Sequence, residues 1–479
     1  MISEYVREQK RYTQKDLCDL LHASEDSVVP VIRKLKEFGV LKAVRASETQ
    51  RDLTDLADID IEIADVEAGE NEYYYVFTFV GVIVVAGRVL KCYPKYLLHA
   101  DNPKEQLRQV LKVLEKYSSK EQIVRMYNES SENRTFNLLA VLLFLLHDYY
   151  NNGVYSNTED IVESNGSGEI LWDKTINDSF TLISGNRPYY IDLQTRKRVT
   201  DEYDYFQRLH ECILTKASKE LADAQLIDIF EITEVDLTDE TLDDFGEEEY
   251  ILYRIEKELN TQFNTRKQLV LKTIYAYLNH KGALNDIDCL SMFGTNSFNL
   301  VWEGVCADIL DNKLNKQIDS LPITVSPRYD RRTRLIDLIE KPLWTITGKT
   351  ATDTLIPDIV SVSKTDNEVA FVLFDAKYYL AELDPDITPK GQPGIESITK
   401  QYLYQLAFLE FIRDHEIDCV KNCFLMPTEQ DAINNKGEVI LEMLASMGLQ
   451  NIQVRLIPAE KAYDLYLSGE KLDVKELRL

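Results

Sequence analysis

The sequence lacks long apolar runs and has few Pro and Gly. Its longest apolar run, LLAVLLFLL over residues 138–146, is about half of what a membrane-spanning helix needs, so it predicts a buried core helix. Only 18 Gly and 13 Pro occur in 479 residues, and 44% are hydrophobic, which indicates a mostly folded chain with room for two to four domains. The start, MISEYVREQK, is polar, so we expect no secretory leader, no membrane attachment and a cytoplasmic location.

Clustered cysteines and histidines are also lacking. The seven cysteines are scattered, and Cys419 and Cys423 form a single C-x-x-x-C without a second ligand pair. The six histidines are spread over the whole length. Because structural zinc needs four clustered ligands, we favour reduced, buried thiols over a zinc site.

Positive charge is scarce, since the formal net charge is −27. Such a charge argues against a protein that coats nucleic acid, but it leaves room for DNA contact at local basic patches or under the control of a partner. Residues 220–253 contain no Lys or Arg at all. This acidic segment is either a solvated face or loop, or a docking surface for a basic partner.

Residues 1–70 predict a small helical module that resembles a winged helix-turn-helix. Thr13 and Asp16 fit a helix start, and a second helix can begin near Ser27, with Pro30 in its first turn. Gly39 closes that helix, and residues 40–44 read as the first strand of the wing. In DNA-binding winged helices the second helix enters the major groove. The alternative is a protein-docking module.

The second helix and wing carry local positive charge, unlike the chain as a whole. The candidate DNA-binding residues of this module are Arg33, Lys34 and Lys36, and the wing adds Lys42 and Arg45. Residues 71–284 predict a mixed central region for partner contact. Its expected parts are a β pair over 73–96, helices within 104–150, a polar loop over 151–168, and helices over 203–220 and 249–280. From residue 285 to 479 the pattern is that of an α/β domain.

The most informative segment is Ile356–Tyr379, in which two β-rich runs flank a turn at Asp366–Asn367. On the second run Asp375 and Lys377 share one face, with Ala376 pointing away. A hairpin with this turn places Asp358 directly opposite Asp375, and opposed Cβ atoms lie roughly 4.5–5.5 Å apart. A slip of one residue would separate the two carboxylates.

Two facing carboxylates repel each other unless a cation lies between them. Mg²⁺ is held in proteins by one or two carboxylates together with water and phosphate oxygens, so we expect Asp358 and Asp375 to ligate Mg²⁺, for which Mn²⁺ can substitute. Lys377 would stabilise the charge that develops on a phosphate, or help to position the attacking water. The arrangement Pro357-Asp358 followed by Asp375-Ala376-Lys377 is that of the PD-(D/E)-x-K nucleases.

Further candidates surround this segment. Gln401 and Gln405 share a face of a helix expected over residues 395–413, where either could orient water or a phosphate, or simply be solvated. Glu303 lies among apolar residues on an upstream helix, and is either a further metal ligand or an ordinary exposed side chain. An arginine-rich segment is either a phosphate-contact loop or a surface loop; its members are Arg328, Arg331, Arg332 and Arg334.

The run from FDAKYY through IESITKQYLYQLAFLEFI resembles the LlaJI-type restriction endonucleases, relatives of the McrC subunit. Residues 92–96, CYPKY, and residues 168–176, GEILWDKTI, are similar to the same family. The resemblance implies an α+β multidomain nuclease that defends its host by cutting double-stranded DNA. It also implies that an McrB-like AAA+ GTPase subunit activates the chain, that Glu303 and the carbonyl of Ala376 complete the metal site, and that the chain can self-associate for double-strand cutting.

The sequence contains no G-x-x-x-x-G-K-[ST] phosphate-binding loop, so nucleotide hydrolysis is expected from another chain. We therefore predict three parts, 1–70, 71–284 and 285–479, and metal-assisted hydrolysis by Asp358, Asp375, Lys377, Glu303 and Gln405. Two other functions stay open. One is a DNA-binding adaptor that keeps a nuclease-like domain for binding only, and the other is a restriction enzyme that needs no motor.

Overall fold

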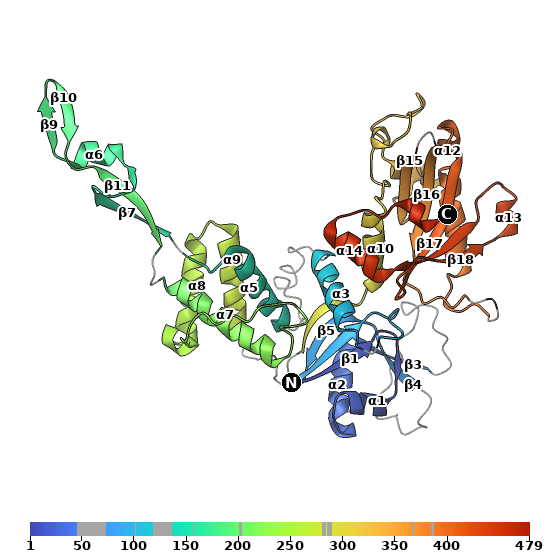
Figure 1. The fold of residues 1–479 in the computed structure, drawn as a ribbon, viewed down its shortest axis with the longest axis horizontal. Coiled ribbons are helices and arrows are strands. Elements are labelled where there is room, and N and C mark those ends of the chain that lie inside the picture. The colour runs from blue at the N-terminus through green and yellow to red at the C-terminus, as the bar shows by residue number, and fades with distance from the viewer. Residues whose placement is uncertain are drawn as a thin grey trace. The chain divides into compact units, whose positions relative to one another are not determined.

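The computed structural model describes residues 1–45, 73–100, 102–117, 137–156, 158–200, 204–279, 284, 290–365, 368–383, 385 and 388–479. The chain forms two compact units (Figure 1). The middle unit consists of Glu132–Ser291 with Met1, and the terminal unit combines Ile2–Ser131 with Met292–Leu479. The two ends of the chain thus belong to one unit. The boundaries of these two units differ from those of the three predicted parts, 1–70, 71–284 and 285–479. The division into three parts remains a prediction.

The N-terminal part of the terminal unit begins as the sequence predicts. Its elements are β1 (Ile2–Arg7), β2 (Arg11–Tyr12), α1 (Gln14–Leu20), α2 (Glu25–Glu37), β3 (Leu41–Arg45) and β4 (Tyr73–Phe77). Thr13 caps α1 in a capping box with Asp16, and Gly39 follows α2 with a φ of 65°. Strands β2, β4 and β3 form a sheet in this order, and residues 46–70 of the predicted module lie outside the described residues.

The predicted start of the second helix near Ser27 is wrong. Helix α2 begins at Glu25 because Ser24 has extended backbone angles and is followed by two acids, Glu25 and Asp26, that favour the first turn. Pro30 therefore lies in the second turn and cannot donate a hydrogen bond there. Its side chain is exposed, and the apolar face of the helix, with Val28, Val31, Ile32 and Leu35, stays buried.

The predicted β pair over residues 73–96 consists of three strands, which is a second correction. Strand β4 joins the sheet of β2 and β3, whereas β5 (Val80–Val85) and β6 (Arg88–Tyr93) belong to another sheet, in the order β1-β6-β5-β12. Thr78 and Phe79 lie between them, and both the backbone N–H and the hydroxyl of Thr78 donate to the carbonyl oxygen of Val40. Strand β12 (Leu290–Thr295) leads from the middle of the chain into the C-terminal half.

The middle unit contains a group of helices and an arm of short strands. Its helices are α5 (Leu138–Asn152), α7 (Tyr205–Asp223), α8 (Glu248–Thr261) and α9 (Thr265–Asn279). The arm consists of β7 (Thr158–Ser164), β8 (Glu169–Ile170), α6 (Trp172–Asp178), β9 (Thr181–Ser184), β10 (Arg187–Tyr190) and β11 (Gln194–Thr200). The predicted polar loop over 151–168 is therefore wrong in part, because β7 pairs antiparallel with β11. No described helix is both long and apolar enough to cross a membrane.

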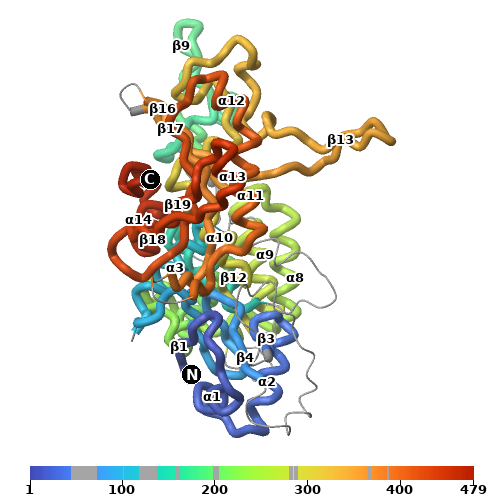
Figure 2. The backbone as a smooth tube through the Cα atoms, turned by 90° about the vertical axis from the view of Figure 1, so that its right-hand side faces the viewer, coloured from blue at the N-terminus to red at the C-terminus, as the bar shows by residue number. Residues whose placement is uncertain are grey.

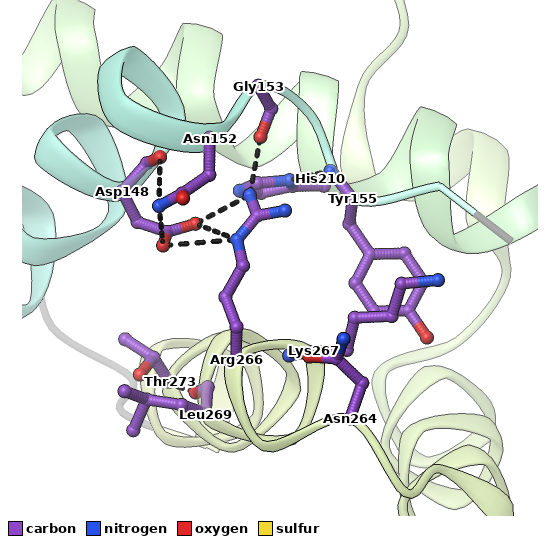
Figure 3. Close-up of polar contacts among 10 residues, drawn as sticks. All are labelled: Asp148, Asn152, Gly153, Tyr155, His210, Asn264, Arg266, Lys267, Leu269 and Thr273. Atoms are coloured by element: carbon purple, nitrogen blue, oxygen red, sulfur yellow. Dashed lines mark hydrogen bonds and ion pairs between the residues drawn. The ribbon is translucent and has the colours of Figure 1, made fainter.

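Buried polar contacts hold the helices of the middle unit together (Figure 3). Arg266 on α9 forms an ion pair with Asp148 on α5 at 2.8 Å and donates to the carbonyl oxygen of Gly153. His210 on α7 accepts a hydrogen bond from the backbone N–H of Tyr155 at 2.9 Å. Burial, opposed by the charge of Asp148 and reinforced by that of Arg266, lowers the pKa of His210 to about 4. This histidine is therefore neutral at physiological pH.

The C-terminal half of the terminal unit is built on a mixed sheet with strand order β15-β16-β17-β19-β18. Its strands are β13 (Leu343–Trp344), β14 (Lys349–Thr350), β15 (Ile359–Thr365), β16 (Glu368–Ala376), β17 (Cys419–Thr428), β18 (Asn434–Val439) and β19 (Ile452–Pro458). Its helices are α10 (Phe298–Ile309), α11 (Ile395–Ala407), α12 (Leu409–Asp414), α13 (Glu442–Ala445) and α14 (Ala459–Ser468). Strand β16 is buried on both faces, and the small hairpin β13–β14 projects away from the sheet (Figure 2).

The two halves of the terminal unit are joined by helix α3 (Lys104–Tyr117) and by polar contacts. Helix α3 packs against α14, and Lys116 on α3 donates to the carbonyl oxygen of Tyr466. The hydroxyl of Tyr378, just after β16, donates to the buried carboxylate of Glu8 at 2.6 Å. The hydroxyl of Tyr96 donates to that of Tyr463 at 3.3 Å. The segment after β1 therefore lies directly against the end of β16.

Candidate active site

The site is organised by the hairpin of β15 and β16. Ile359 pairs with Phe374 and Val360 with Leu373 in an antiparallel register. This register confirms the predicted one, since it puts Asp358, the residue before β15, opposite Asp375. The predicted turn at Asp366–Asn367 lies outside the described residues.

Asp358 is held against the end of β16. Its Oδ2 accepts a hydrogen bond from the backbone N–H of Ala376 at 3.2 Å, and its carbonyl oxygen accepts one from the side chain of Asn312 at 2.9 Å. Its carboxyl group also shares a hydrogen bond with that of Asp375. Burial, this hydrogen bond and the charges of Asp375 and Glu303 raise the pKa of Asp358. Keeping both carboxylates ionised therefore requires added positive charge.

Lys377 supplies part of this positive charge. Its Nζ lies 2.8 Å from Oδ1 of Asp375, which is only 3% exposed. Burial acts to lower the pKa of Lys377, but the charges of Asp375, Asp358 and Glu303 outweigh burial and raise it, so the side chain stays charged. The buried Oδ1 nevertheless accepts no hydrogen bond of acceptable geometry, despite the short distance to Nζ. This oxygen is thus available to a further ligand.

Glu303 completes the acidic side of the site. It lies on α10 between buried residues and is itself half-buried, which replaces the alternative of an ordinary exposed glutamate. Its pKa is raised by burial, lowered by the charge of Lys377 and raised by that of Asp375. Glu303 and Lys377 also line the same cavity.

The carboxylates fit a divalent cation. No described group of three or more His, Cys, Asp and Glu side chains is arranged closely enough to hold a metal ion by itself. Two facing carboxylates are sufficient for Mg²⁺, which keeps several water molecules in most protein sites. Oδ1 of Asp375 is paired with Lys377 alone among the described side chains, and the pKa of Asp358 is raised, so a further cation at the two carboxylates would stabilise their ionised forms.

The two predicted glutamines are buried rather than solvated. Gln401 donates to the carbonyl oxygen of Leu373 at 3.0 Å. The side-chain oxygen of Gln405 accepts hydrogen bonds from the side chain of Asn422 at 2.8 Å and from the backbone N–H of Gln450 at 2.9 Å. These contacts indicate that Gln405 stabilises the fold of the domain. They do not include a contact with the other proposed catalytic residues, so its role in catalysis remains a prediction.

Tyr404 is a site residue that the sequence analysis missed. It is buried on α11, and its pKa is raised to about 12 by burial and by the charges of Asp358 and Asp375. Its side chain packs in the apolar cluster that also contains Val360 and Leu373 of the hairpin. The helical spacing of residues 401, 404 and 405 contained this signal, because all three belong to the face that packs on the sheet.

The predicted arginine loop is divided between two environments. Arg328 forms ion pairs with Glu410 at 2.5 Å and Asp414 at 3.0 Å, and Arg334 pairs with Asp337 at 2.8 Å. Arg331 and Arg332 are exposed, as is Arg33 on α2, whereas Lys34 and Lys36 are half-buried. Arg328 and Arg334 are exposed as well, so exposure does not distinguish these residues, and their DNA contacts stay predictions.

The cysteines that the structure describes are free, in line with the prediction of reduced thiols. Cys423 is buried in β17, and burial raises the pKa of its thiol. Cys419 is half-buried at the start of the same strand. Neither belongs to a metal-binding group within the described ranges.

Comparison with known proteins agrees with the resemblance found in the sequence. A curated relative is the "Type II restriction enzyme BsuMI component YdjA" of Bacillus subtilis (strain 168), 26% identical over 414 residues, which are 84% of this chain and 83% of that protein. Two solved assemblies of Thermococcus gammatolerans are similar in part. The first, a half-complex of McrB AAA+ hexamers with bound McrC, has 12% identity and a TM-score of 0.39 over 98% of this chain and 99% of the other. The second, the McrBC complex, has 13% identity and a TM-score of 0.26 over 63% and 84%.

The sequence model of the LlaJI restriction endonuclease family matches residues 79–457, which include the hairpin, α11 and the surrounding sheet. This match extends over most of the chain. The protein therefore belongs to the LlaJI restriction endonuclease family.

Proposed function

We propose that this chain is the nuclease subunit of a restriction system and hydrolyses phosphodiester bonds of double-stranded DNA with Mg²⁺. The observation that carries the proposal is the pairing of Asp358 with Asp375 at the end of a buried hairpin, with Lys377 at 2.8 Å. Membership of a restriction endonuclease family supports the reaction class. We assign the C-terminal half to the PD-(D/E)-x-K nucleases on the same grounds.

Each residue of the site has a chemical task in this reaction. Asp358 and Asp375 would hold the cation, with Glu303 and the carbonyl oxygen of Ala376 as further ligands. When bound, Mg²⁺ stabilises charge on the phosphate and lowers the pKa of water. Lys377 stays charged and donates to an oxygen of the scissile phosphate, where negative charge increases in the transition state.

A separate motor subunit is the second part of the proposal. The relative from Bacillus subtilis is described as a component of its enzyme, which supports a subunit role. We propose an McrB-like AAA+ GTPase as the partner, following the resemblance of the sequence to McrC relatives. The arm of the middle unit is the surface that we assign to the partner. It exposes an unusual set of large apolar side chains, namely Trp172, Ile176, Phe180, Leu182, Ile183, Tyr189 and Ile191.

The N-terminal part is proposed to be a winged helix that contacts DNA. Two helices are followed by the strands β3 and β4, which pair in a three-stranded sheet with β2. Helix α2 presents the exposed Arg33 and the half-buried Lys34 and Lys36. Protein docking by this module is the alternative.

Plasmid cleavage tests the proposed function. Wild type and Asp375→Ala would be incubated with supercoiled plasmid and Mg²⁺, with and without GTP and the product of the neighbouring gene. We expect the wild type to cleave and Asp375→Ala not to cleave. We also expect that cleavage requires both the partner and GTP. Cleavage without a partner would support the assigned active site. It would also show that the chain is a stand-alone restriction enzyme and does not depend on a motor subunit. Absence of cleavage under all conditions would favour the DNA-binding adaptor.

A further inference from the structure

A cavity of about 350 Å³ lies beside Lys377, within the terminal unit. Its wall comes from both ends of the chain. The C-terminal half contributes Asn296, Asn299, Glu303, Ala376 and Lys377, and the N-terminal half contributes Glu8, Gln9, Gly39, Lys42, Thr78 and Lys95. The cavity is therefore bordered by three of the proposed site residues, Glu303, Ala376 and Lys377, and is completed by a part of the chain that carries none of them.

The charge of the cavity differs from that of the molecule. Three lysines, Lys42, Lys95 and Lys377, outnumber the two glutamates, Glu8 and Glu303, that line the same small cavity, in a chain whose net charge is −27. The carboxylate of Glu8 is buried in the wall, where it accepts hydrogen bonds from the hydroxyl of Tyr378 at 2.6 Å and from the backbone N–H of Lys95 at 3.2 Å. Lys95 lies over the ring of Tyr378 at 4.4 Å from its centre. Lys95 is thus held in the cavity wall by Glu8 and Tyr378.

The remaining polar groups suit a nucleotide. Gln9, Asn296 and Asn299 carry side-chain amides, which hydrogen-bond to the edges of bases. Asn296 donates to the carbonyl oxygen of Gly39 at 3.3 Å, so the wall at this point is fixed across the two halves. A volume near 350 Å³ is at the small end of ligand-binding cavities, which matches one nucleotide and is too small for a folded segment.

We infer that the nucleotide next to the scissile phosphate enters this cavity and that Lys42 binds its phosphate. The inference rests on the proposed nuclease function and extends it to the substrate. The amides of Gln9 and Asn299 contact the base, and Lys377 acts on the neighbouring scissile phosphate. The N-terminal half is then a part of the active site, and its wing strand β3 contacts the cleaved strand of DNA.

The salt dependence of DNA binding tests the contact of Lys42. A fluorescein-labelled duplex would be titrated with the full chain in the cleavage-inactive Asp375→Asn background, at several KCl concentrations. Removing one phosphate contact lowers the slope of log affinity against log salt by about 0.9, and weakens binding about threefold to tenfold. We expect both changes for Lys42→Ala. The control Lys15→Ala removes an exposed lysine of α1 outside the cavity and should change neither.

A second variant distinguishes contact with the base from contact with the phosphate. Gln9→Ala removes a neutral amide, so it should weaken binding without changing the salt slope, and Lys42→Arg should restore the slope of the wild type. Unfolding midpoints equal to that of the parent protein would exclude a folding defect. If Lys42→Ala binds DNA as Lys15→Ala does, the inference is wrong.

Cleavage kinetics distinguish failure of this inference from failure of the proposed function. With Asp375 intact, Lys42→Ala should raise KM more than it lowers kcat, because a bound phosphate is lost and the reacting groups stay. A wild type that cleaves while Lys42→Ala retains its KM would overturn only the nucleotide cavity. A wild type that cleaves no DNA, with or without partner and GTP, would overturn both.

Discussion

Asp375 lies at the end of β16 and Lys377 directly follows this strand, yet the two side chains lie in different environments. Asp375 is almost fully buried, while Lys377 is half-buried and lines a cavity. The ion pair between them, with Nζ 2.8 Å from Oδ1, keeps the lysine charged. A lysine in this position acts on charge that appears during the reaction, so its removal should affect the rate more than the fold.

Lys377→Ala should therefore lower the rate of DNA cleavage about 100-fold to 1000-fold, the usual effect of removing one charged donor from a transition state. Lys364→Ala, on the same hairpin, is the matched control because Lys364 is exposed. Initial rates on plasmid, together with unfolding midpoints, would measure the effect. Full activity of Lys377→Ala would remove the lysine from the mechanism.

Gln405 is expected to act on stability instead. Its side-chain oxygen accepts two hydrogen bonds within the domain, so Gln405→Ala leaves Asn422 and the backbone N–H of Gln450 with fewer partners. The free energy of unfolding should fall by about 2–3 kcal/mol. Urea titration would measure this loss, with Lys400→Ala, exposed on the same helix, as control. If Gln405→Ala is as stable as the wild type but cleaves DNA 100-fold more slowly per folded molecule, Gln405 takes part in catalysis.

His210 makes the stability of the middle unit depend on pH. Its pKa is lowered from 6.5 to about 4 in the folded state, so the unfolded chain binds the additional proton between these values. The contribution of His210 to the free energy of unfolding is fully present above pH 6.5. It is lost as the pH falls toward 4, and the loss is about 3 kcal/mol at most. His210→Gln should be less stable than the wild type at pH 7.5, and this difference should shrink by pH 4.5. Urea unfolding followed by circular dichroism would check it; a constant difference would contradict the assignment.

At the scale of elements, the site depends on how closely β5 approaches β12. A Cβ on Gly81 would lie 2.1 Å from the carbonyl oxygen of Phe293, and one on Gly294 would lie 2.1 Å from that of Val80. Gly81 also has a φ of 140°. Strand β12 leads into α10, which carries Glu303 and Asn299. The two glycines thus permit the contact that brings α10 to the N-terminal half.

Gly81→Ala should lower the free energy of unfolding of the terminal unit by about 2–4 kcal/mol, because backbone must move and the φ is unfavourable. Gly394→Ala meets no atom within 4 Å and has a φ of −71°, so its cost should stay below about 1 kcal/mol. Chemical unfolding of both variants would compare them. Equal stability of the two would show that the close approach is not required.

The elements that the sequence predicted well are those with a local cause. The register of β15 and β16 follows from alternating side chains on two adjacent runs, so Asp358 and Asp375 could be paired without a structure. The capping box at Thr13 is equally local. Strand β7 was missed because its pairing with β11 depends on residues about 30 positions away, within a polar segment that resembles a loop.

The nucleotide cavity could not be predicted, for the same physical reason. Lys42 and Lys377 lie far apart in the sequence, and no local pattern brings them together. The burial of Gln401 and Gln405 was missed as well, since polar residues at helical spacing resemble a solvated face until the packing of α11 on the sheet is known. Tertiary packing, rather than propensity, decides these positions.

At the scale of the molecule, a strongly acidic chain that acts on DNA must restrict where DNA is attracted. Lys42, Lys95 and Lys377 line one small cavity beside the proposed catalytic residues, and the other candidates for DNA contact lie on α2 and in the arginine-rich segment. The proposed site belongs to the terminal unit, and the arm that we assign to a partner belongs to the middle unit. This arrangement is compatible with the proposal that a second subunit brings DNA to the site.

The central claim is that Asp358 and Asp375 hold the divalent cation with which this chain cuts DNA. The most direct measurement is Mn²⁺ binding to the full chain, followed by electron paramagnetic resonance of the free ion, beside plasmid cleavage by the same preparation with its partner and GTP. We predict that the wild type binds Mn²⁺ and cleaves, and that Asp375→Asn does neither while its unfolding midpoint is unchanged. An Asp375→Asn variant that binds Mn²⁺ and cleaves DNA like the wild type would contradict the claim.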